Sequence, residues 1–434
     1  MAYGKFPMAS AHNRLLDKSP RNSQSGRVSK KTRNKFLALL CLLVFVAGGA
    51  LYYVNWVVQR PFGIILFVAD NFCVSALTAA RIYGGGADSR LSVERFPTVT
   101  HLTTHAADFA VSDLASAATA LACGRKVNNR NLGQEAPGIP LPTLVEMARE
   151  RGRAVGLVTN TSLTDTGPAV WYAKTSDPRD STGLALQLAG SSGLDVLLGG
   201  GAADFLPEHK GGRRADGRDL LLEMRQAGYD VIRNKGELSN TPAWRAPRLL
   251  GFFSEGNLAF ADEVAQAAAQ PSLSEMVAKA VQLLQFNRRG YLLVVDAGLI
   301  EKAASQNEGE RMLREFLQLD QAVATALDYA GKNSLIIVAG RSMVGGLRMN
   351  GYPFRNDKGV AVIGLNAQGI PSLTWSTGPG SGEGTPPSEP AAAQQPVAVG
   401  VAEDALAVAV GPGTEHWPSF MDNTDVFRLI VPGL

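Results

Sequence analysis

Several acidic residues in this chain lie at or just after the end of a short apolar run. Asp70 follows GIILFVA, Asp296 ends GYLLVVD, and Glu301 stands a few residues further on. Clustered carboxylates bind divalent cations or exchange protons. In open α/β sheets, ligands bind beyond the carboxyl ends of the strands, so the fold must position these side chains at one edge.

The spacing of the apolar runs predicts an α/β fold. Short apolar runs alternate with longer helix-like segments, which is typical of parallel strands that crossover helices bury on both faces. Helices are expected near residue 141, from Pro271 and from Gly309. The strand candidates are GIILFVA before Asp70, AVGLVTN before Thr161, DVLLGGG ending at Gly201, GYLLVVD ending at Asp296 and SLIIVAG ending at Gly340. We therefore expect a central, mostly parallel sheet flanked by helices on both faces.

Residues 36–57 are predicted to form one transmembrane signal-anchor helix. The uncharged run from Phe36 to Val54 is long enough to cross a hydrocarbon core of about 30 Å. Residues 1–35 are strongly basic, which favours a cytoplasmic tail, an inner-membrane location and a periplasmic C-terminal domain. A cleaved signal peptide is the alternative, but the small residues from Ala47 to Ala50 make a poor cleavage site.

The overall composition is that of a globular protein. The chain has 434 residues and a formal net charge of +3, and much of the excess positive charge falls in the basic tail. No nucleic-acid partner is therefore indicated. Cys41 lies in the apolar run, whereas Cys73 and Cys123 form either one disulfide or two buried free thiols, and the sequence leaves both readings open.

Residues 61–434 are expected to form one domain. Within it, residues 377–397 are rich in Pro, Gly, Ser and Ala, so we expect them to form a flexible loop rather than an element of their own. The segment GVAEDALAVAVGPG that follows predicts one more strand of the same domain.

Seven segments of the exported part carry a family resemblance. In order they are FVADNF (67–72), VSDLASAATALACG (111–124), VTNTSLTDTGPA (158–169), VLLGGGAADFLP (196–207), PSLSEMVAKAV (271–281), YLLVVDAGLIEK (291–302) and GIPSLTWSTGPG (369–380). They resemble the successive blocks of the alkaline phosphatases from Gly63 to the C-terminus. The resemblance implies a phosphomonoesterase site with a serine nucleophile, two zinc ions, one magnesium ion and a phosphate-clamping arginine. Members of this family are often homodimers, so a homodimer stays open.

The nucleophile that the resemblance implies is missing. In the family it directly follows an aspartate at the start of a helix, whereas here Asp113 is followed by Leu114, which has no heteroatom to attack phosphorus. Ser116 is the nearby candidate for a surrogate nucleophile. A residue two positions along a helix points in another direction, so we interpret Ser116 as a small packing residue.

Most of the implied metal ligands are also replaced. Asp70 matches a carboxylate that bridges zinc and magnesium, while Asp296 stands for a magnesium-binding Glu and Glu301 for a zinc-binding Asp. A carboxylate displaced by one methylene misses the narrow distances that metals require. Three further ligand positions hold Ser305 for a histidine and the pair Gly340 and Arg341 for an Asp-His pair. We expect no bound cofactor in place of the zinc and magnesium of the family, with weak magnesium or calcium binding at Asp70 and Asp296 left open.

The phosphate-binding positions are partly kept. Asp165 and Lys302 resemble an Asp and a Lys that surround the phosphate in bacterial members, whereas a magnesium-binding Thr maps to Gly167. The clamping arginine maps to Pro178, and Arg179 is one place away. Bidentate clamping depends on the planar guanidinium, so this offset argues against it.

The fold that the resemblance implies would crowd five carboxylates into one crevice, and their repulsion needs an offsetting charge. We predict an ion-pair network centred on Arg341, which pairs with Asp70 and Glu301 while Lys302 or Arg179 assists. The favoured function is that of a pseudophosphatase that binds a protein partner or a small anionic ligand in the periplasm. A divergent metal-dependent phosphomonoesterase and a purely structural envelope protein are the alternatives.

Overall fold

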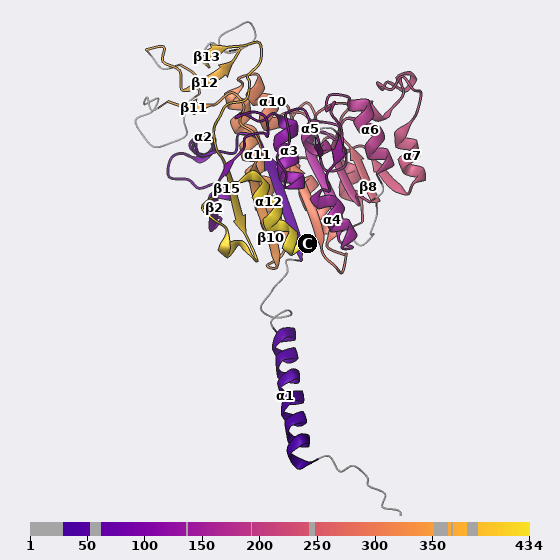
Figure 1. The fold of residues 1–434 in the computed structure, drawn as a ribbon. Helices are drawn as coiled ribbons and strands as arrows, with labels where there is room; N and C mark the ends of the chain where they lie inside the picture. The colour runs from indigo at the N-terminus through magenta and orange to yellow at the C-terminus, as the bar shows by residue number, and fades with distance from the viewer. Residues whose placement is uncertain are drawn as a thin grey trace, which may run out of the picture. The chain divides into compact units, whose positions relative to one another are not determined.

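The computed structural model describes residues 29–52, 62–135, 138–191, 193–242, 248–350, 363–365, 368–379 and 389–434. The chain divides into two compact units, Met1–Gln59 and Arg60–Leu434. The second unit carries all the candidate site residues, and Figure 1 shows its central sheet between layers of helices.

The described part of the first unit is one helix, α1 (Lys30–Tyr52). By length and composition it is able to cross a membrane. It begins before the predicted span 36–57, because the Lys and Arg residues that precede Phe36 are good helix formers and extend it toward the N-terminus. The remainder of the predicted span lies outside the described residues.

The second unit is built on a sheet of ten strands. Its order across the sheet is β15 (Phe420–Asp422), β2 (Thr98–Thr103), β14 (Ala405–Val410), β10 (Ser334–Gly340), β1 (Gly63–Ala69), β9 (Tyr291–Asp296), β5 (Ala154–Ser162), β6 (Val196–Gly200), β8 (Arg248–Phe252) and β7 (Tyr229–Ile232). All neighbours from β10 to β7 run parallel, whereas β14 is antiparallel to both β10 and β2. The mostly parallel sheet expected from the sequence is confirmed.

The central strands β10, β1 and β9 are buried along their whole length. Their apolar runs form strands because helices cover both faces and leave no side facing water. In register, Ala69 lies beside Gly340 and Val68 beside Asp296. The three strands therefore end together, and the residues that follow them meet at one edge.

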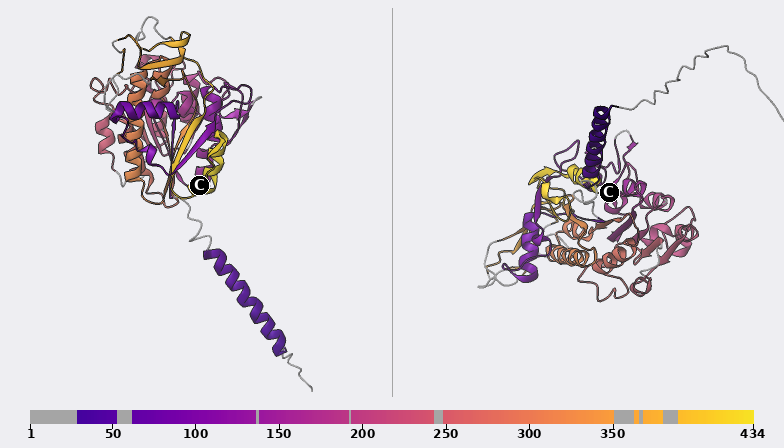
Figure 2. Two further views of the ribbon diagram at one scale, coloured as in Figure 1. Left: turned by 90° about the vertical axis from the view of Figure 1, so that its left-hand side faces the viewer. Right: turned by 90° about the horizontal axis from the view of Figure 1, so that it is seen from below.

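Two layers of helices cover this sheet (Figure 2). One layer contains α2 (Val74–Gly85), α9 (Leu273–Leu284), α10 (Leu299–Ser305) and α11 (Gly309–Tyr329), and the other contains α3 (Leu114–Cys123), α4 (Leu144–Glu150), α5 (Thr166–Ala169) and α12 (Asn423–Ile430). Three further helices are α6 (Ser181–Gly190), α7 (Leu220–Gln226) and α8 (Lys235–Asn240). Short 3-10 helices occupy Val93–Arg95, Ala202–Phe205, Glu208–Lys210, Thr414–His416 and Val431–Gly433, and a small hairpin joins β3 (Gln134–Glu135) to β4 (Ile139–Pro140).

Part of the predicted flexible loop 377–397 is a strand, so that prediction was wrong there. A small second sheet joins β11 (Arg348–Met349), β12 (Leu373–Gly378) and β13 (Ala391–Gln394). Glu389, just before β13, accepts hydrogen bonds from the backbone N–H of Gly309 and from Nε1 of Trp375. This tertiary anchoring holds an Ala-rich segment that has little strand propensity of its own.

The cysteines are free thiols in this structure. Cys73 and Cys123 are buried, and Cys41 is exposed. Of the two arrangements that the sequence left open, the structure has the one without a disulfide.

Candidate functional site

The guanidinium of Arg341 fills the edge of the sheet where β10, β1 and β9 end. Its Nε and Nη2 donate to the two carboxylate oxygens of Asp70 at 3.1 and 2.6 Å, and its Nη1 donates to Oδ2 of Asp296 at 2.5 Å. Both carboxylates are fully buried and Arg341 is 1% exposed. The predicted pairing of Arg341 with Asp70 is confirmed.

The two carboxylates of this cluster are satisfied to different degrees. Asp70 also accepts from the backbone N–H and the Oγ of Ser342, at 3.2 and 2.6 Å. By contrast, Oδ1 of Asp296 has no hydrogen-bond partner among the described residues. Asp296 therefore accepts fewer hydrogen bonds than Asp70 does.

The pKa values in the cluster reflect both burial and pairing. Burial raises the pKa of Asp296 to about 6; the Arg341 charge opposes this rise and Asp70 adds to it. Burial disfavours the charged guanidinium, but Asp296 and Asp70 outweigh it, so the pKa of Arg341 is raised above its ordinary value. Arg341 thus stays charged at any working pH.

Two glycines make this arrangement possible. A Cβ on Gly167 would lie 2.3 Å from Nη1 of Arg341 and 2.7 Å from Oδ2 of Asp296. A Cβ on Gly340 would lie 2.6 Å from the Cβ of Ala405 and 2.9 Å from the carbonyl oxygen of Phe72. A side chain at residue 167 would thus collide with Arg341. A side chain at residue 340 would collide with Ala405 and with the backbone of Phe72.

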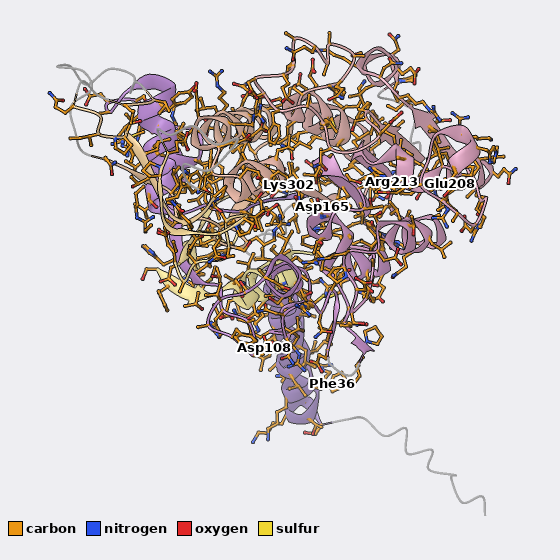
Figure 3. The ribbon with its side chains drawn as sticks, turned by 90° about the horizontal axis from the view of Figure 1, so that it is seen from above. Phe36, Asp108, Asp165, Glu208, Arg213 and Lys302 are labelled. Carbon is orange, nitrogen blue, oxygen red and sulfur yellow. The ribbon has the colours of Figure 1, made fainter. Side chains whose placement is uncertain are left out.

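A second polar cluster surrounds Lys302, which lies next to Asp165 in Figure 3. Its Nζ lies 2.8 Å from Oδ2 of Asp165 and 3.1 Å from Oε2 of Glu301. Burial lowers the pKa of Lys302, but the two carboxylates outweigh burial and raise it. The predicted Arg341–Glu301 pair was therefore wrong: Glu301 stands on α10, a turn beyond β9, and Lys302 neutralises it there.

The start of α3 holds Leu114 where the resemblance implies a nucleophile. Asp113 is the N-cap, and its Oδ1 accepts from the backbone N–H of Ser116 at 2.8 Å. Ser116 is buried, with its Oγ 2.7 Å from Oδ1 of Asn129. Asp113 and Ser116 thus stabilise the first turn of the helix, and Ser116 faces the 125–135 loop.

A pocket with a volume of about 840 Å³ opens beside Leu114. It is lined by Asp108, Phe109, Asp113, Leu114, Ala115, Asn129, Arg130, Thr166, Ser176, Asp177, Pro178 and Arg179. Arg179 and Arg130 are exposed, and Phe109 is 66% exposed. Arg130 has a φ of 70°, a conformation in which residues other than Gly are uncommon. The pocket thus combines two guanidinium groups with an exposed aromatic ring.

The remaining replaced positions lie around the same edge. Ser305 ends α10, and its Oγ donates to the carbonyl oxygen of Lys302 at 2.8 Å. Gly400, near which a third zinc-binding histidine is implied, pairs with Val344 in a β-bridge. A Cβ at residue 400 would lie 2.7 Å from Cγ1 of Val111. Neither position carries the histidine that the resemblance implies as a zinc ligand.

The residues present do not fit the two zinc ions and the magnesium of the family. Asp70 and Asp296, which would supply oxygens, both accept from Arg341, and Glu301 is next to Lys302. Within the described part of the chain, no group of three or more His, Cys, Asp or Glu side chains is arranged to hold a metal ion. The same guanidinium pairs with Asp70 and Asp296, the two carboxylates of the predicted weak magnesium or calcium site.

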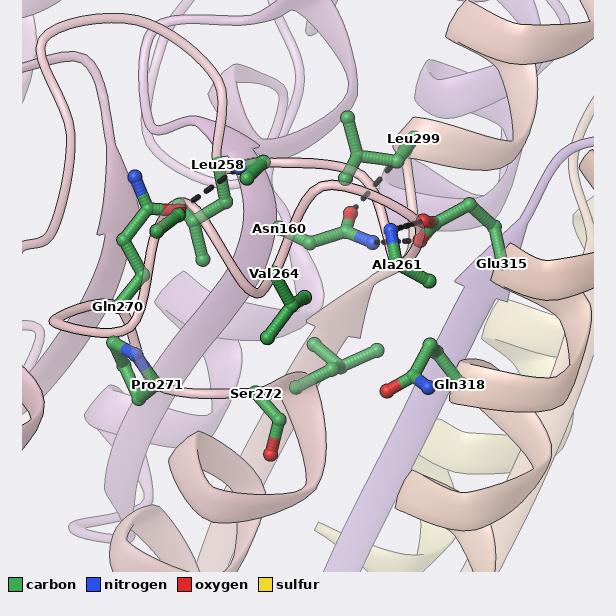
Figure 4. A pocket seen from close by; sticks show the side chains of 13 residues that line it. Asn160, Leu258, Ala261, Val264, Gln270, Pro271, Ser272, Leu299, Glu315 and Gln318 are labelled. Atoms are coloured by element: carbon green, nitrogen blue, oxygen red, sulfur yellow. Dashed lines mark hydrogen bonds between the residues drawn. The ribbon is translucent and has the colours of Figure 1, made fainter. Parts of the chain in front are cut away.

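A buried carboxylate outside the Arg341 and Lys302 clusters was missed by the sequence reasoning. Glu315 on α11 is 3% exposed; it accepts from the backbone N–H of Ala261 at 2.7 Å and from Nδ2 of Asn160 at 3.4 Å (Figure 4). It borders a small cavity of about 50 Å³. Burial raises its pKa to about 7. The available signal was its helical spacing from the apolar residues Met312 and Leu319, which predicts an inward-facing side chain.

Comparison with known proteins agrees with this architecture. Residues 63–369 match the family model described as alkaline phosphatase. The chain is 31% identical over 314 residues to the tissue-nonspecific alkaline phosphatase of Gallus gallus, covering 61% of this chain and 60% of that protein. It is 28% identical over 373 residues to the membrane-bound alkaline phosphatase of Bombyx mori, covering 73% and 67%.

Solved structures show the same fold. The alkaline phosphatase of Thermus thermophilus superimposes with a TM-score of 0.73 at 24% identity, over 87% of this chain and 92% of that one. The enzyme of the Antarctic bacterium TAB5 gives a TM-score of 0.69 at 20% identity, over 86% and 98%. The likeness covers nearly the whole of both bacterial proteins.

Proposed function

The chain belongs to the alkaline phosphatase family, and from that premise we propose that it is a membrane-anchored pseudophosphatase. In this proposal the domain binds an anionic ligand or a partner on the extracytoplasmic side and does not hydrolyse phosphate monoesters. The helix α1 is the anchor, and the basic residues before it keep the N-terminus in the cytoplasm.

The observation that carries this proposal is the Arg341 guanidinium between Asp70 and Asp296. A divalent cation held by these carboxylates would lie next to a buried positive charge. At about 4 Å and an effective dielectric constant near 20, that repulsion is roughly 8 kcal/mol. The arginine therefore replaces metal ions as the counter-charge of the site, and with them it removes the means to activate a nucleophile.

Leu114 supports the same conclusion independently. A phosphoryl group transferred to the enzyme needs an oxygen, nitrogen or sulfur atom at this position, and Leu114 has only carbon. Restoring a hydroxyl there would leave the metal positions unchanged. Two separate defects therefore block the reaction.

The pocket beside Leu114 is the proposed ligand site. Arg130 and Arg179 present guanidinium groups that match phosphate or carboxylate oxygens, and Phe109 and Leu114 offer apolar contact. An anionic ligand with an apolar part suits this combination. Asp108 and Asp177 in the lining disfavour ligands of high negative charge.

The test is a phosphatase assay with metal analysis on the full chain in detergent, with zinc, magnesium and an aryl phosphate supplied. We expect no turnover and no stoichiometric zinc, for the native chain and for Leu114→Ser alike. Leu222→Ser, at an exposed leucine on α7, is the matched control. Zinc-dependent turnover with near-stoichiometric zinc would overturn the proposal in favour of a divergent phosphomonoesterase.

A binding measurement completes the test. Phenyl phosphate titrated into the full chain by calorimetry should bind, and Arg179→Gln should weaken binding roughly 10-fold, the effect of losing one charge-assisted hydrogen bond. Arg213→Gln removes an exposed arginine outside this pocket and should leave the affinity unchanged. Equal affinity in the Arg179→Gln variant would remove this pocket from the proposal.

A further inference from the structure

Four arginines gather at the edge of the sheet opposite to Arg341. Arg151, Arg153, Arg288 and Arg289, with Phe62, Asn333 and Leu434, line a pocket of about 410 Å³. Phe62 precedes the first residue of β1, Arg153 precedes that of β5, and Arg289 lies just before β9. The arginine pocket therefore sits at the amino ends of the central strands, where the proposed ligand site does not reach.

The framework of this pocket is ordered by its own arginines. Arg153 is 8% exposed, and its Nη1 and Nη2 donate to the carbonyl oxygens of Phe62 and Gly433 at 3.0 and 2.6 Å. Arg151 donates from Nη1 to the carbonyl oxygen of Val431 at 2.5 Å. These bonds join the entry of the chain into β1 to its last 3-10 turn and fix the walls of the pocket.

The other arginines of this pocket leave a positive charge that is accessible to solvent. Arg151, Arg288 and Arg289 are exposed, and none of them forms an ion pair with another described residue. No Asp or Glu side chain is among the residues that line the pocket. A guanidinium binds phosphate oxygens in a bidentate manner, so a phosphodiester fits the chemistry of this surface.

The position of Phe62 in the chain points to one source of phosphate. Residues 53–61 join the end of α1 to Phe62. A linker of this length spans at most roughly 35 Å when fully extended. If α1 crosses a membrane, Phe62 and the pocket around it stay within that reach of the lipid headgroups.

We propose that the arginine pocket binds the phosphodiester headgroups of anionic phospholipids in the membrane that holds α1. The proposal rests on the anchor described under the proposed function, and it is independent of whether the domain hydrolyses phosphate.

The test uses the full chain in nanodiscs of phosphatidylcholine alone or mixed with phosphatidylglycerol. Phenylglyoxal modifies accessible arginines, and peptide mass spectrometry gives the rate at each one. An arginine near an anionic surface gains roughly a five-fold preference for it, so modification of Arg288 and Arg289 should slow about five-fold in the anionic discs. Arg130, beside Leu114 at the opposite edge, should react equally in both.

Variants separate this pocket from general charge. Arg288→Gln with Arg289→Gln should abolish the lipid-dependent protection of Arg151, whereas Arg213→Gln with Arg218→Gln, in the loop after β6, should preserve it. Equal modification in both kinds of disc overturns the proposal. So does protection by inorganic phosphate without protection by phosphatidylglycerol. Failure of the chain to remain in the discs would instead show that the anchor itself is wrong.

Discussion

Two regions of this domain bury carboxylates in different ways. At the carboxyl ends of the central strands, Asp70 and Asp296 share the guanidinium of Arg341. On α11, Glu315 is buried with only a backbone N–H and an amide as donors. The first region holds a guanidinium in direct contact with its carboxylates, whereas Arg311, the nearby positive charge of the second, pairs with Asp262, Glu263 and Glu308 instead.

The difference shows in the protonation of the two regions. The pKa of Glu315 is raised to about 7, because burial outweighs the Ala261 N–H and the nearby Asp262 adds to the rise. The pKa of Asp296 is raised to about 6 although burial is complete, since Arg341 opposes the effect of burial. In the first region the positive charge is part of the protein, whereas in the second burial raises the proton affinity of the carboxylate.

The largest expected effect comes from removing the counter-ion. Arg341→Met leaves Asp70 and Asp296 buried without a positive partner, which should lower the free energy of unfolding by about 3–5 kcal/mol at neutral pH. The loss should shrink in acid, because Asp296, whose pKa is raised to about 6, then takes up a proton. Urea denaturation of the full chain in detergent, followed by circular dichroism at several pH values, measures both effects.

Arg213→Met provides the matched control for this substitution. Arg213 also pairs with a buried carboxylate, that of Asp204, but its own side chain is 60% exposed. Asp204 keeps its bonds from Thr164 and Ser181, so the loss should stay within about 1 kcal/mol. Equal losses in the two variants would show that Arg341 acts as a packing residue and not as a counter-ion.

The sequence predicted the central strands well and the small sheet poorly. Runs such as GIILFVA and SLIIVAG are buried on both faces, so their composition alone identifies them as β1 and β10. Strand β13 consists mainly of alanine and forms because β12 and Glu389 hold it in place. Composition does not contain such tertiary contacts, and the segment therefore resembled a loop.

The candidate site was predictable in its charges but not in its pairing. Charge balance identified Arg341 as the partner of Asp70, and this is correct. The choice between Asp296 and Glu301 depends on register, because β9 ends next to β1 whereas Glu301 lies in the first turn of the helix that follows. The role of Gly167 in leaving room for Arg341 could not be predicted from the sequence, because it depends on how these two distant residues lie in space.

Glu315, which forms no ion pair with another described residue, should make the stability of the chain depend on pH. The pKa of Glu315 in the folded chain, about 7, exceeds the ordinary value of about 4.3. The folded state therefore binds the proton more tightly, and this stabilisation is full below the ordinary pKa and is lost as the pH rises through about 7. Glu315 should thus make stability fall by up to about 3 kcal/mol between these pH values.

Glu315→Gln tests this by removing the titration. The free energy of unfolding of the variant, measured by urea denaturation from pH 4 to pH 8, should depend less steeply on pH than that of the native chain. Glu308→Gln, at a half-buried glutamate before α11, is the matched control and should keep the native slope. Identical slopes in the native chain and in Glu315→Gln would mean that Glu315 titrates as an ordinary carboxylate.

The smallest effect lies inside the Arg341 cluster, where the two carboxylates are not equivalent. Asp70 accepts four hydrogen bonds from Arg341 and Ser342, whereas Asp296 accepts one from Arg341 and leaves Oδ1 without a described partner. An amide at residue 70 would turn an NH₂ group toward one of these donors and cost about 2–3 kcal/mol. An amide at residue 296 keeps an acceptor for Arg341 and relieves the repulsion from Asp70, so Asp296→Asn should cost about 1 kcal/mol or less. Urea denaturation of both variants at neutral pH ranks them, and a larger loss in Asp296→Asn than in Asp70→Asn would mean that the guanidinium depends on Asp296 for its position.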